Sequence, residues 1–336
     1  MSIVSTALRI MRTSRPLAAS LAVAAITAMP LAAARAEYPD HPVTIVACFP
    51  AGGGTDLAAR MIHVELGKAL GQPVIVENRG GAGGSIGTGV VARATPDGYT
   101  LLVCSSAFVV NPSLYAKVPY DPFKDFEPVM VIGASPNVFV VPAQSKIQSM
   151  REFIEKAKAN PGKLNWTSPG VGTTPQLAGE LLKIKAGIDI VHIPYAGAGP
   201  AANAVLAGLV DMYTANYGSL TGLLSAKKVR PIAVTSKTRW ADLPDVPTLD
   251  ELGIKDAESD TFQGIFAPAG TPKPIVDKLA NAIGKILAEP EMKAKYAKLG
   301  LPVLAEGPAA FAARIKREVP MYKEVIDKAG LQIKNK

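Results

Sequence analysis

The sequence predicts an α/β protein of two domains, each a mostly parallel sheet flanked by helices. Three observations favour this fold. Strand-like and helix-like segments alternate along most of the chain, which is typical of parallel sheets. A glycine-rich turn leads into a helix in each half. The chain has 336 residues, which is long enough for two domains of ordinary size.

The first 36 residues are predicted to be a signal peptide (1–36) that is cleaved after Ala36. Three arginines precede an apolar stretch, and Ala34-Arg35-Ala36 fits the small-x-small cleavage pattern. Pro30 interrupts the stretch, which makes it a poor membrane span. Cleavage also removes four basic residues and lowers the net charge from +8 to +4: Arg9, Arg12, Arg15 and Arg35. We expect an exported, periplasmic protein.

The first domain is predicted to begin as β-α-β-α-β. Its strands are expected at 43–49, 73–78 and 99–106, and its helices follow the glycine-rich turns 51–54 and 79–87. Thr55 is the expected N-cap of the first helix, and Gly71 is expected to end it. The apolar face of that helix is expected to carry Leu57, Met61, Val64, Leu66 and Leu70.

The second domain repeats the alternation, and two helical segments, 272–300 and 307–330, end the chain. The chain is expected to cross between domains near Ser135 and again near Ser259. Residues 37–135 and 260–336 would then form one domain, and 136–259 the other. Two such linkers would allow the domains to close on a ligand by hinge bending.

Two glycine-rich turns are candidate anion sites: "AGGGTD", 51–56, and "GVGTTP", 170–175. Each leads into a helix, and the free N–H groups of a helix N-terminus attract anions. Thr174 is the expected N-cap of the second helix, with Pro175 in its first turn. Such turns lie at the carboxyl ends of parallel strands, where ligands bind. A plain loop connection is the alternative for either turn taken alone.

Motifs for catalysis, metals and cofactors are missing from the sequence. It has neither a P-loop nor a G-x-S-x-G elbow, and its glycine turns do not fit G-x-G-x-x-G. His41, His63 and His192 stand in no metal-binding spacing. Basic residues are scattered, so a nucleic-acid surface is not indicated. We expect no cofactor, no metal and no catalytic residue.

Several long motifs resemble one family in order along the mature chain: "YPDHPVTIVACFPAGGGTDLAAR", "GQPVIVENRGGAGGSIGTGVVARATPDGYTLL", "DIVHIPYAGAGPA" and "AVTSKTRWADLPDVPTLDELG". The chain is similar to the Bug, or TctC-like, periplasmic solute receptors of tripartite tricarboxylate transporters. The resemblance implies a two-domain periplasmic binding protein of the Venus-flytrap type. It also implies a small carboxylate ligand, transporter subunits as membrane partners and a monomeric receptor. Competing hypotheses are a sensor for a signalling partner and a secreted enzyme acting on a small acid.

Carried over by position, the resemblance implies ligand contacts from both domains. The first domain would contribute Phe49, Ala51, Gly52, Gly53, Thr55, Asp56, Ser105 and Ser106. The second would contribute Gly170, Gly172, Thr173, Thr174, Tyr195, Ala196, Gly197 and, as a further candidate, Asn216. Asp56 cannot favour an ionised carboxylate directly, so we expect it to orient its loop, hold water or bind another group of the ligand.

The two cysteines leave a choice open. Cys48 and Cys104 end the first and third predicted strands, which are neighbours in a doubly wound 2-1-3 order. A disulfide between them is one expectation, since an oxidising compartment permits it. Two buried free thiols are the other.

Overall fold

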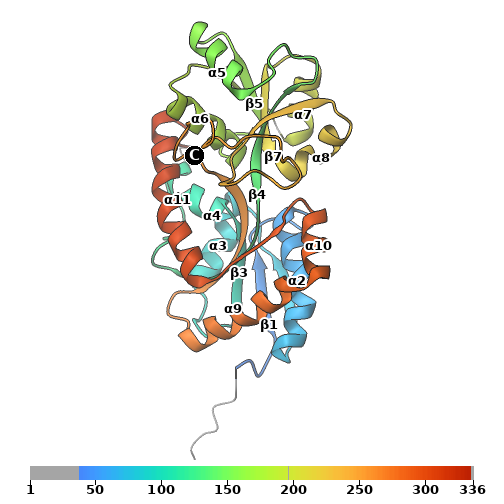
Figure 1. Ribbon diagram of the computed structural model, residues 1–336. Helices are drawn as coiled ribbons and strands as arrows, with labels where there is room; N and C mark the ends of the chain where they lie inside the picture. The colour runs from blue at the N-terminus through green and yellow to red at the C-terminus, as the bar shows by residue number, and fades with distance from the viewer. Residues whose placement is uncertain (1–37, 196, 334–336) are drawn as a thin grey trace, which may run out of the picture. The chain divides into compact units, whose positions relative to one another are not determined.

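The computed structural model describes residues 38–195 and 197–333. The expected signal peptide lies outside these residues. The described residues from Pro39 onward form one compact unit, shown in Figure 1. The strands of the described residues join in one mixed ten-stranded sheet whose main path runs β2-β1-β3-β9-β4-β7-β5-β6.

Three parallel strands form the core of the first half of the sheet: β1 (Val43–Ala47), β2 (Val74–Asn78) and β3 (Thr100–Ser105). Their order is the 2-1-3 order that the sequence predicts. The linking helices are α2 (Gly54–Leu70), the short η1 (Ala82–Gly84) and α3 (Ser85–Ala92). After β3 comes α4 (Ala107–Leu114).

Three more parallel strands form the core of the second half: β5 (Asn165–Ser168), β6 (Val191–Pro194) and β7 (Met212–Asn216). The helices of this half are α5 (Met150–Ala159), α6 (Thr174–Ala186), α7 (Ala198–Leu206) and α8 (Tyr217–Ser225). The half ends with β8 (Val229–Val234).

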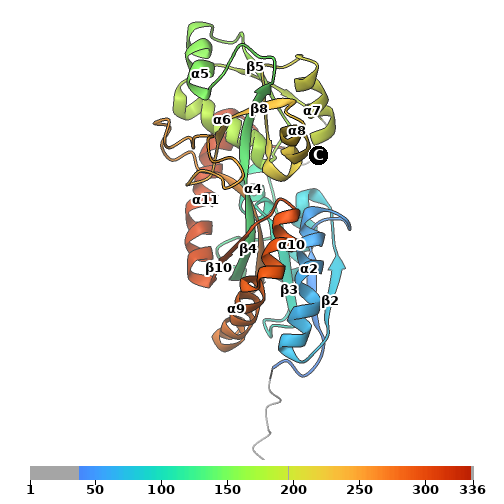
Figure 2. The same ribbon diagram turned by 45° about the vertical axis from the view of Figure 1, so that its right-hand side comes forward.

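Two antiparallel strands connect the halves. The long strand β4 (Phe126–Pro142) runs through both halves (Figures 1 and 2). It pairs with β9 (Asp260–Pro268) up to Pro136; from Asn137 it pairs with β7, and from Val138 it pairs with β8 as well. The halves therefore meet beside the expected linkers. Hinge bending between two domains remains a prediction.

The C-terminal segment covers both halves. It contains α9 (Lys273–Ala288), α10 (Pro290–Lys298), β10 (Val303–Glu306) and α11 (Pro308–Ala329). Helix α11 contacts α4 of the first half and α6 of the second. Phe311 of α11 is fully buried against Phe262 and Phe266 of β9, and burying each ring is worth about 1.5–3 kcal/mol.

Two sequence-based helix predictions are wrong in detail. The segment 272–300 is two helices, because Pro290 disfavours helical geometry at Glu289 before it. Helix α2 leaves Leu57 and Val64 exposed and buries Ala58, Ala59 and Ile62. Small residues face inward because α2 packs closely on the sheet and on α9 and α10, where the Tyr296 hydroxyl donates to the Ala58 carbonyl.

The structure decides between the two cysteine hypotheses in favour of the bridge. Cys48 and Cys104 form a disulfide, with their Cα atoms 5.5 Å apart. Parallel pairing of β1 and β3 creates this proximity, since Cys48 follows the last paired residue of β1. Both residues are buried.

Replacing both cysteines by alanine is expected to lower the free energy of unfolding by about 2–4 kcal/mol, because the bridge closes a long loop in the unfolded chain. Urea unfolding followed by circular dichroism measures the change. Wild type under a reductant should then behave like the variant. Identical urea midpoints for oxidised and reduced wild type would contradict the expectation.

Candidate functional site

The first glycine turn is held by a buried carboxylate. Asp56 is 2% exposed and accepts from the Gly52 N–H at 2.8 Å, the Arg60 Nε at 2.8 Å and the Asn78 Nδ2 at 2.9 Å. Burial raises the pKa of Asp56, but these three partners hold it below the usual aspartate value. Gly52 has φ +82°, which favours glycine. Asp56 therefore orients the turn, as one of the sequence-based alternatives expects.

The predicted N-cap of the first helix is wrong. Helix α2 begins at Gly54, and Gly53, in extended geometry, is its N-cap. The Thr55 hydroxyl instead donates to the Gln263 Oε1 of β9 at 2.9 Å. Gln263 is 208 residues away in the sequence. Because the Thr55 hydroxyl bonds to it, Thr55 does not act as the helix cap that the local sequence suggests.

The predicted N-cap of the second helix is wrong by one residue. Thr173 caps α6 and accepts from the Gln176 N–H, while Thr174 is the first helical residue and Pro175 lies in the first turn. Gln176 also accepts from the Gly172 N–H at 2.6 Å. The Thr174 hydroxyl is thereby free of capping and contacts the Thr261 hydroxyl of β9.

The N-termini of α4 and α6 open onto one cavity of about 300 Å³, which we name the large cavity. Seven of the predicted contacts line it: Phe49, Ser105, Ser106, Gly172, Thr173, Thr174 and Asn216. Eight others do not: Ala51, Gly52, Gly53, Thr55, Asp56, Gly170, Tyr195 and Gly197. Ala196 lies outside the described residues.

Sequence reasoning missed one wall of the large cavity. The wall consists largely of α4 and its flanks, with Val110, Asn111, Leu114 and Tyr115, and Thr261 joins it from β9. Helix α4 was not predicted because it contains Pro112, and proline disfavours the interior of a helix. Ser105 and Ser106 were the available signal, because small hydroxyl residues after a strand often begin a helix.

Among the residues that the structure describes, no charged side chain lines the large cavity. Its polar groups are hydroxyls, amides and the two helix N-termini, each equivalent to roughly half a positive charge. The Thr174 N–H has no hydrogen-bond partner among the described residues. The cavity can therefore accept an anionic group through neutral donors, while Val110, Leu114 and Val171 supply apolar contacts.

His192 lies next to the glycine turn 170–175 of the second half and is neutral at pH 7. His192 packs on Trp166, lies 2.9 Å from the Ser168 Oγ, and contacts the Gln176 amide. Burial, with a smaller effect of Lys183, lowers the pKa of His192 to about 4. His192 therefore supports the Gln176 side chain that holds Gly172.

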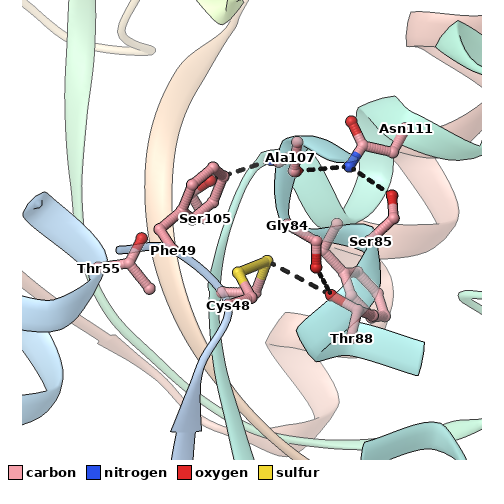
Figure 3. Close-up of a disulfide and its surroundings, with 12 residues drawn as sticks. Cys48, Phe49, Thr55, Gly84, Ser85, Thr88, Ser105, Ala107 and Asn111 are labelled. Atoms are coloured by element: carbon pink, nitrogen blue, oxygen red, sulfur yellow. Dashed lines mark hydrogen bonds between the residues drawn. A yellow bond between two sulfur atoms is a disulfide. The ribbon is translucent and has the colours of Figure 1, made fainter. Parts of the chain in front are cut away.

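The disulfide fixes the first-half wall of the large cavity. Figure 3 shows it beside Phe49 and Ser105, which directly follow Cys48 and Cys104. The Thr88 hydroxyl reaches the Cys104 Sγ at 3.8 Å and donates to the Gly84 carbonyl at 2.9 Å. The bridge thus holds the segment at Phe49 and the segment at Ser105, which both line the large cavity, next to each other.

Ser106 connects the cavity to the strand that passes between the halves. Its hydroxyl donates to the Asp260 carbonyl at 3.2 Å and accepts from the Phe262 N–H at 2.9 Å. Within residues 38–195 and 197–333, no group of side chains is arranged to hold a metal ion. No helix in that part of the chain has the length and apolar character to cross a membrane.

Comparison with known proteins gives a consistent result. The family described as "Tripartite tricarboxylate transporter family receptor" matches residues 58–331. A protein from the tcbD-tcbE intergenic region of Pseudomonas sp. (strain P51) is 38% identical over 313 residues, 93% of each chain.

Solved structures with the same fold include a TctC solute binding protein from Polaromonas, with a TM-score of 0.80 and 31% identity over 87% of this chain and 99% of that one. A protein of R. palustris with adipate matches with a TM-score of 0.71 and 31% identity over 88% and 99%. MatC from Rhodopseudomonas palustris with bound malate matches with a TM-score of 0.68 and 32% identity over 86% and 100%.

Proposed function

The chain belongs to the tripartite tricarboxylate transporter receptor family, and we propose that it captures a small carboxylate in the large cavity and delivers it to the membrane subunits of such a transporter. Members of this family are solute-binding receptors and not enzymes. Two relatives were solved with adipate and with malate. We infer that the receptor acts in the periplasm after cleavage of its signal peptide.

The observation that carries the proposal is the convergence of two helix N-termini on a cavity without charged side chains. A carboxylate there would accept from the Thr174 N–H and from one hydroxyl of the bonded pair Thr174 and Thr261, while the Asn216 amide, which donates to Asn137 and Thr261, would hold that pair in place. Hydrogen bonds to an ionised group are worth about 1.5–3 kcal/mol each. Several such bonds can replace an arginine without bringing a second charge into the cavity.

The other predicted contacts remain predictions. Ala51, Gly52 and Gly53 belong to the turn that Asp56 orients, and they would reach the ligand through water or a small loop movement. Tyr195 and Gly197 flank the Gly170 turn, where the Gly197 N–H donates to the Pro169 carbonyl at 2.8 Å. A monomeric receptor is likewise still a prediction.

A thermal-shift screen of small carboxylates tests the proposal. A ligand at 100 times its Kd should add about 2.7 kcal/mol to the free energy of unfolding. Thr174→Val should then weaken its binding by roughly tenfold, because it removes a hydroxyl but not the helix cap. Thr221→Val, on exposed α8 surface, is the matched control.

The outcome separates the candidate functions. NMR should recover the ligand unchanged after long incubation, whereas turnover would indicate the alternative enzyme. Equal carboxylate affinity for wild type and Thr174→Val would remove the large cavity from consideration as the binding site.

A further inference from the structure

Asn137 lies where the long strand β4 passes from the first half of the sheet to the second. Its neighbour Pro136 is opposite Asp260 of β9, and Asn137 itself is opposite Asn216 of β7. The Asn137 side chain is fully buried and does not line the large cavity. A fully buried amide needs hydrogen-bond partners for its oxygen and its nitrogen, so the partners of Asn137 indicate its role.

The orientation of the Asn137 amide is fixed by a backbone carbonyl. The Asn137 Nδ2 donates to the carbonyl oxygen and to the hydroxyl of Ser259, at 3.3 Å each. Because a carbonyl oxygen only accepts hydrogen bonds, the amide nitrogen faces Ser259 and the amide oxygen faces Asn216. The backbone of Asn137 is held as well: its N–H donates to the Thr235 hydroxyl at 2.9 Å, and its carbonyl accepts from the Thr235 N–H at 3.0 Å.

The same rule fixes the Asn216 amide. The Asn137 Oδ1 only accepts, so the Asn216 Nδ2 faces it and donates to it at 3.0 Å. The second hydrogen of this Nδ2 goes to the Thr261 Oγ1, 2.5 Å away. The Thr261 hydroxyl therefore accepts from Asn216 and has its own hydrogen left to donate.

This direction of donation decides which hydroxyl serves a ligand. The Thr261 and Thr174 hydroxyls contact each other, and either oxygen could be the donor if the pair stood alone. Successive hydrogen bonds in one direction strengthen one another, so Thr261, which accepts from Asn216, donates to Thr174. The Thr174 hydroxyl then has its hydrogen free for the large cavity, which Thr174 lines, beside its unpaired N–H.

We propose that Asn137 is a positioning residue for ligand binding, which acts through Asn216 and Thr261 to make the Thr174 hydroxyl a donor. We name this chain of four side chains the amide relay. The inference rests on the proposed function. A carboxylate accepts at both of its oxygens, whereas a primary amide of the same shape carries donors at one of the two positions. The amide relay therefore makes the large cavity select an acid over its amide.

The test compares acids with their amides. Calorimetry measures succinate, glutarate, butyrate and benzoate, together with succinamide, glutaramide, butyramide and benzamide, and the tightest acid is studied further with its amide. Wild type should bind the acid at least about tenfold tighter than the amide. Asn137→Leu should weaken the acid about fivefold and the amide by less than about twofold, because a Thr174 hydroxyl released from the relay can turn to accept from the amide.

A double-mutant cycle checks that Asn137 acts through Thr174. Thr174→Val alone should weaken the acid by roughly tenfold. Adding Asn137→Leu to Thr174→Val should then change the affinity very little, because residues of one hydrogen-bond network have effects that are not additive. Independent residues would instead give losses that multiply, to about fiftyfold.

Three further variants separate positioning from folding. Burial favours the neutral acid of Asn137→Asp, whose O–H can donate to Ser259 while its other oxygen accepts from Asn216, so this variant should bind the acid more tightly than Asn137→Leu. Asn137→Ser, too short to reach Asn216, replaces Asn137→Leu if the latter does not fold. Thr248→Val is the control: it removes another buried hydroxyl of the second half, which accepts from the Glu251 N–H at 3.1 Å, and should leave the affinity unchanged.

Each outcome has a distinct meaning. If the acid binds to wild type but Asn137→Leu weakens acid and amide equally, or not at all, the amide relay is refuted and the proposed function stands. Losses that multiply in the double-mutant cycle lead to the same conclusion. If no acid of this set or of the thermal-shift screen binds to wild type, the proposed function fails and the amide relay fails with it.

Discussion

Gly172→Val is expected to weaken carboxylate binding by roughly a hundredfold while the chain still folds. Gly172 lines the large cavity with φ +77°, and a Cβ on it would lie 2.4 Å from a methyl carbon of Leu114. Leu114 ends α4 and is 3% exposed, so it cannot move aside freely. Overpacking of this kind costs about 1–3 kcal/mol, and the strained backbone adds about as much.

The structure offers a control for backbone strain. Gly187 caps the opposite end of the same helix α6 with φ +60°, and a Cβ there would meet no atom within 4 Å. Gly187→Val therefore carries comparable strain without the collision. It should lower stability and leave ligand affinity unchanged.

A second substitution should partly rescue binding. Leu114→Ala removes the side chain that valine at position 172 would strike, so the double variant should bind more tightly than Gly172→Val alone. Calorimetry with the carboxylate found in the thermal-shift screen measures the affinity of wild type, Gly172→Val, Gly187→Val and the double variant. Circular dichroism checks that each protein is folded. Wild-type affinity in a folded Gly172→Val protein would contradict the assigned cavity.

The sequence predicted the regular part of the fold well, because alternation and glycine turns are local signals. It identified the strands and helices from β1 to β3 and their order. It missed that β4 is one continuous strand through both halves, since Pro128 and Pro136 are residues that usually exclude a strand interior. Register and antiparallel partners, such as Asp260 opposite Pro136, depend on contacts that no local pattern encodes.

The candidate site was predictable to the same extent. The second glycine turn and the serines Ser105 and Ser106 line the large cavity, whereas the first glycine turn, 51–56, does not. The caps were displaced because Thr55 and Thr174 find partners on β9, far along the chain. Thr261 reaches the large cavity only because β9 pairs with β4 where the halves meet, so sequence alone could not select it.

Arg314→Met is expected to lower the free energy of unfolding by about 3–5 kcal/mol. The Arg314 side chain is 7% exposed and forms ion pairs with Asp260 at 2.9 Å, Glu306 at 2.8 Å and Glu318 at 2.8 Å. Removing the cation leaves three largely buried carboxylates together, and breaking a buried ion pair in this way is strongly destabilising. Urea unfolding near neutral pH measures the loss.

The same cluster should make stability depend on pH. Burial, followed by the charge of Asp260, raises the pKa of Glu318 from 4.5 to about 7. The folded chain therefore retains a proton that the unfolded chain loses, and this contribution to stability is present below pH 4.5 and disappears as the pH rises through about 7. Glu318→Gln should flatten that part of the stability profile.

Ligand binding should respond to Arg314→Met as well. Asp260 begins β9 where the halves meet, and its carbonyl accepts from the Ser106 hydroxyl at the large cavity. Losing the arginine frees Asp260 to shift and carries Ser106 with it, so the carboxylate affinity should fall together with stability.

Arg317 supplies the matched control, because it lies on the same helix but is 58% exposed and pairs only with Glu318 among the described residues, at 3.2 Å. Glu318 is 5% exposed but keeps its ion pair with Arg314 when Arg317 is replaced, and the Arg317 side chain is mostly in solvent. Arg317→Met should therefore lower stability less than Arg314→Met does and leave affinity unchanged. Equal destabilisation by both substitutions would mean that net charge, and not the buried cluster, sets the effect. Full ligand affinity in a folded Arg314→Met protein would show that Ser106 is positioned without Asp260.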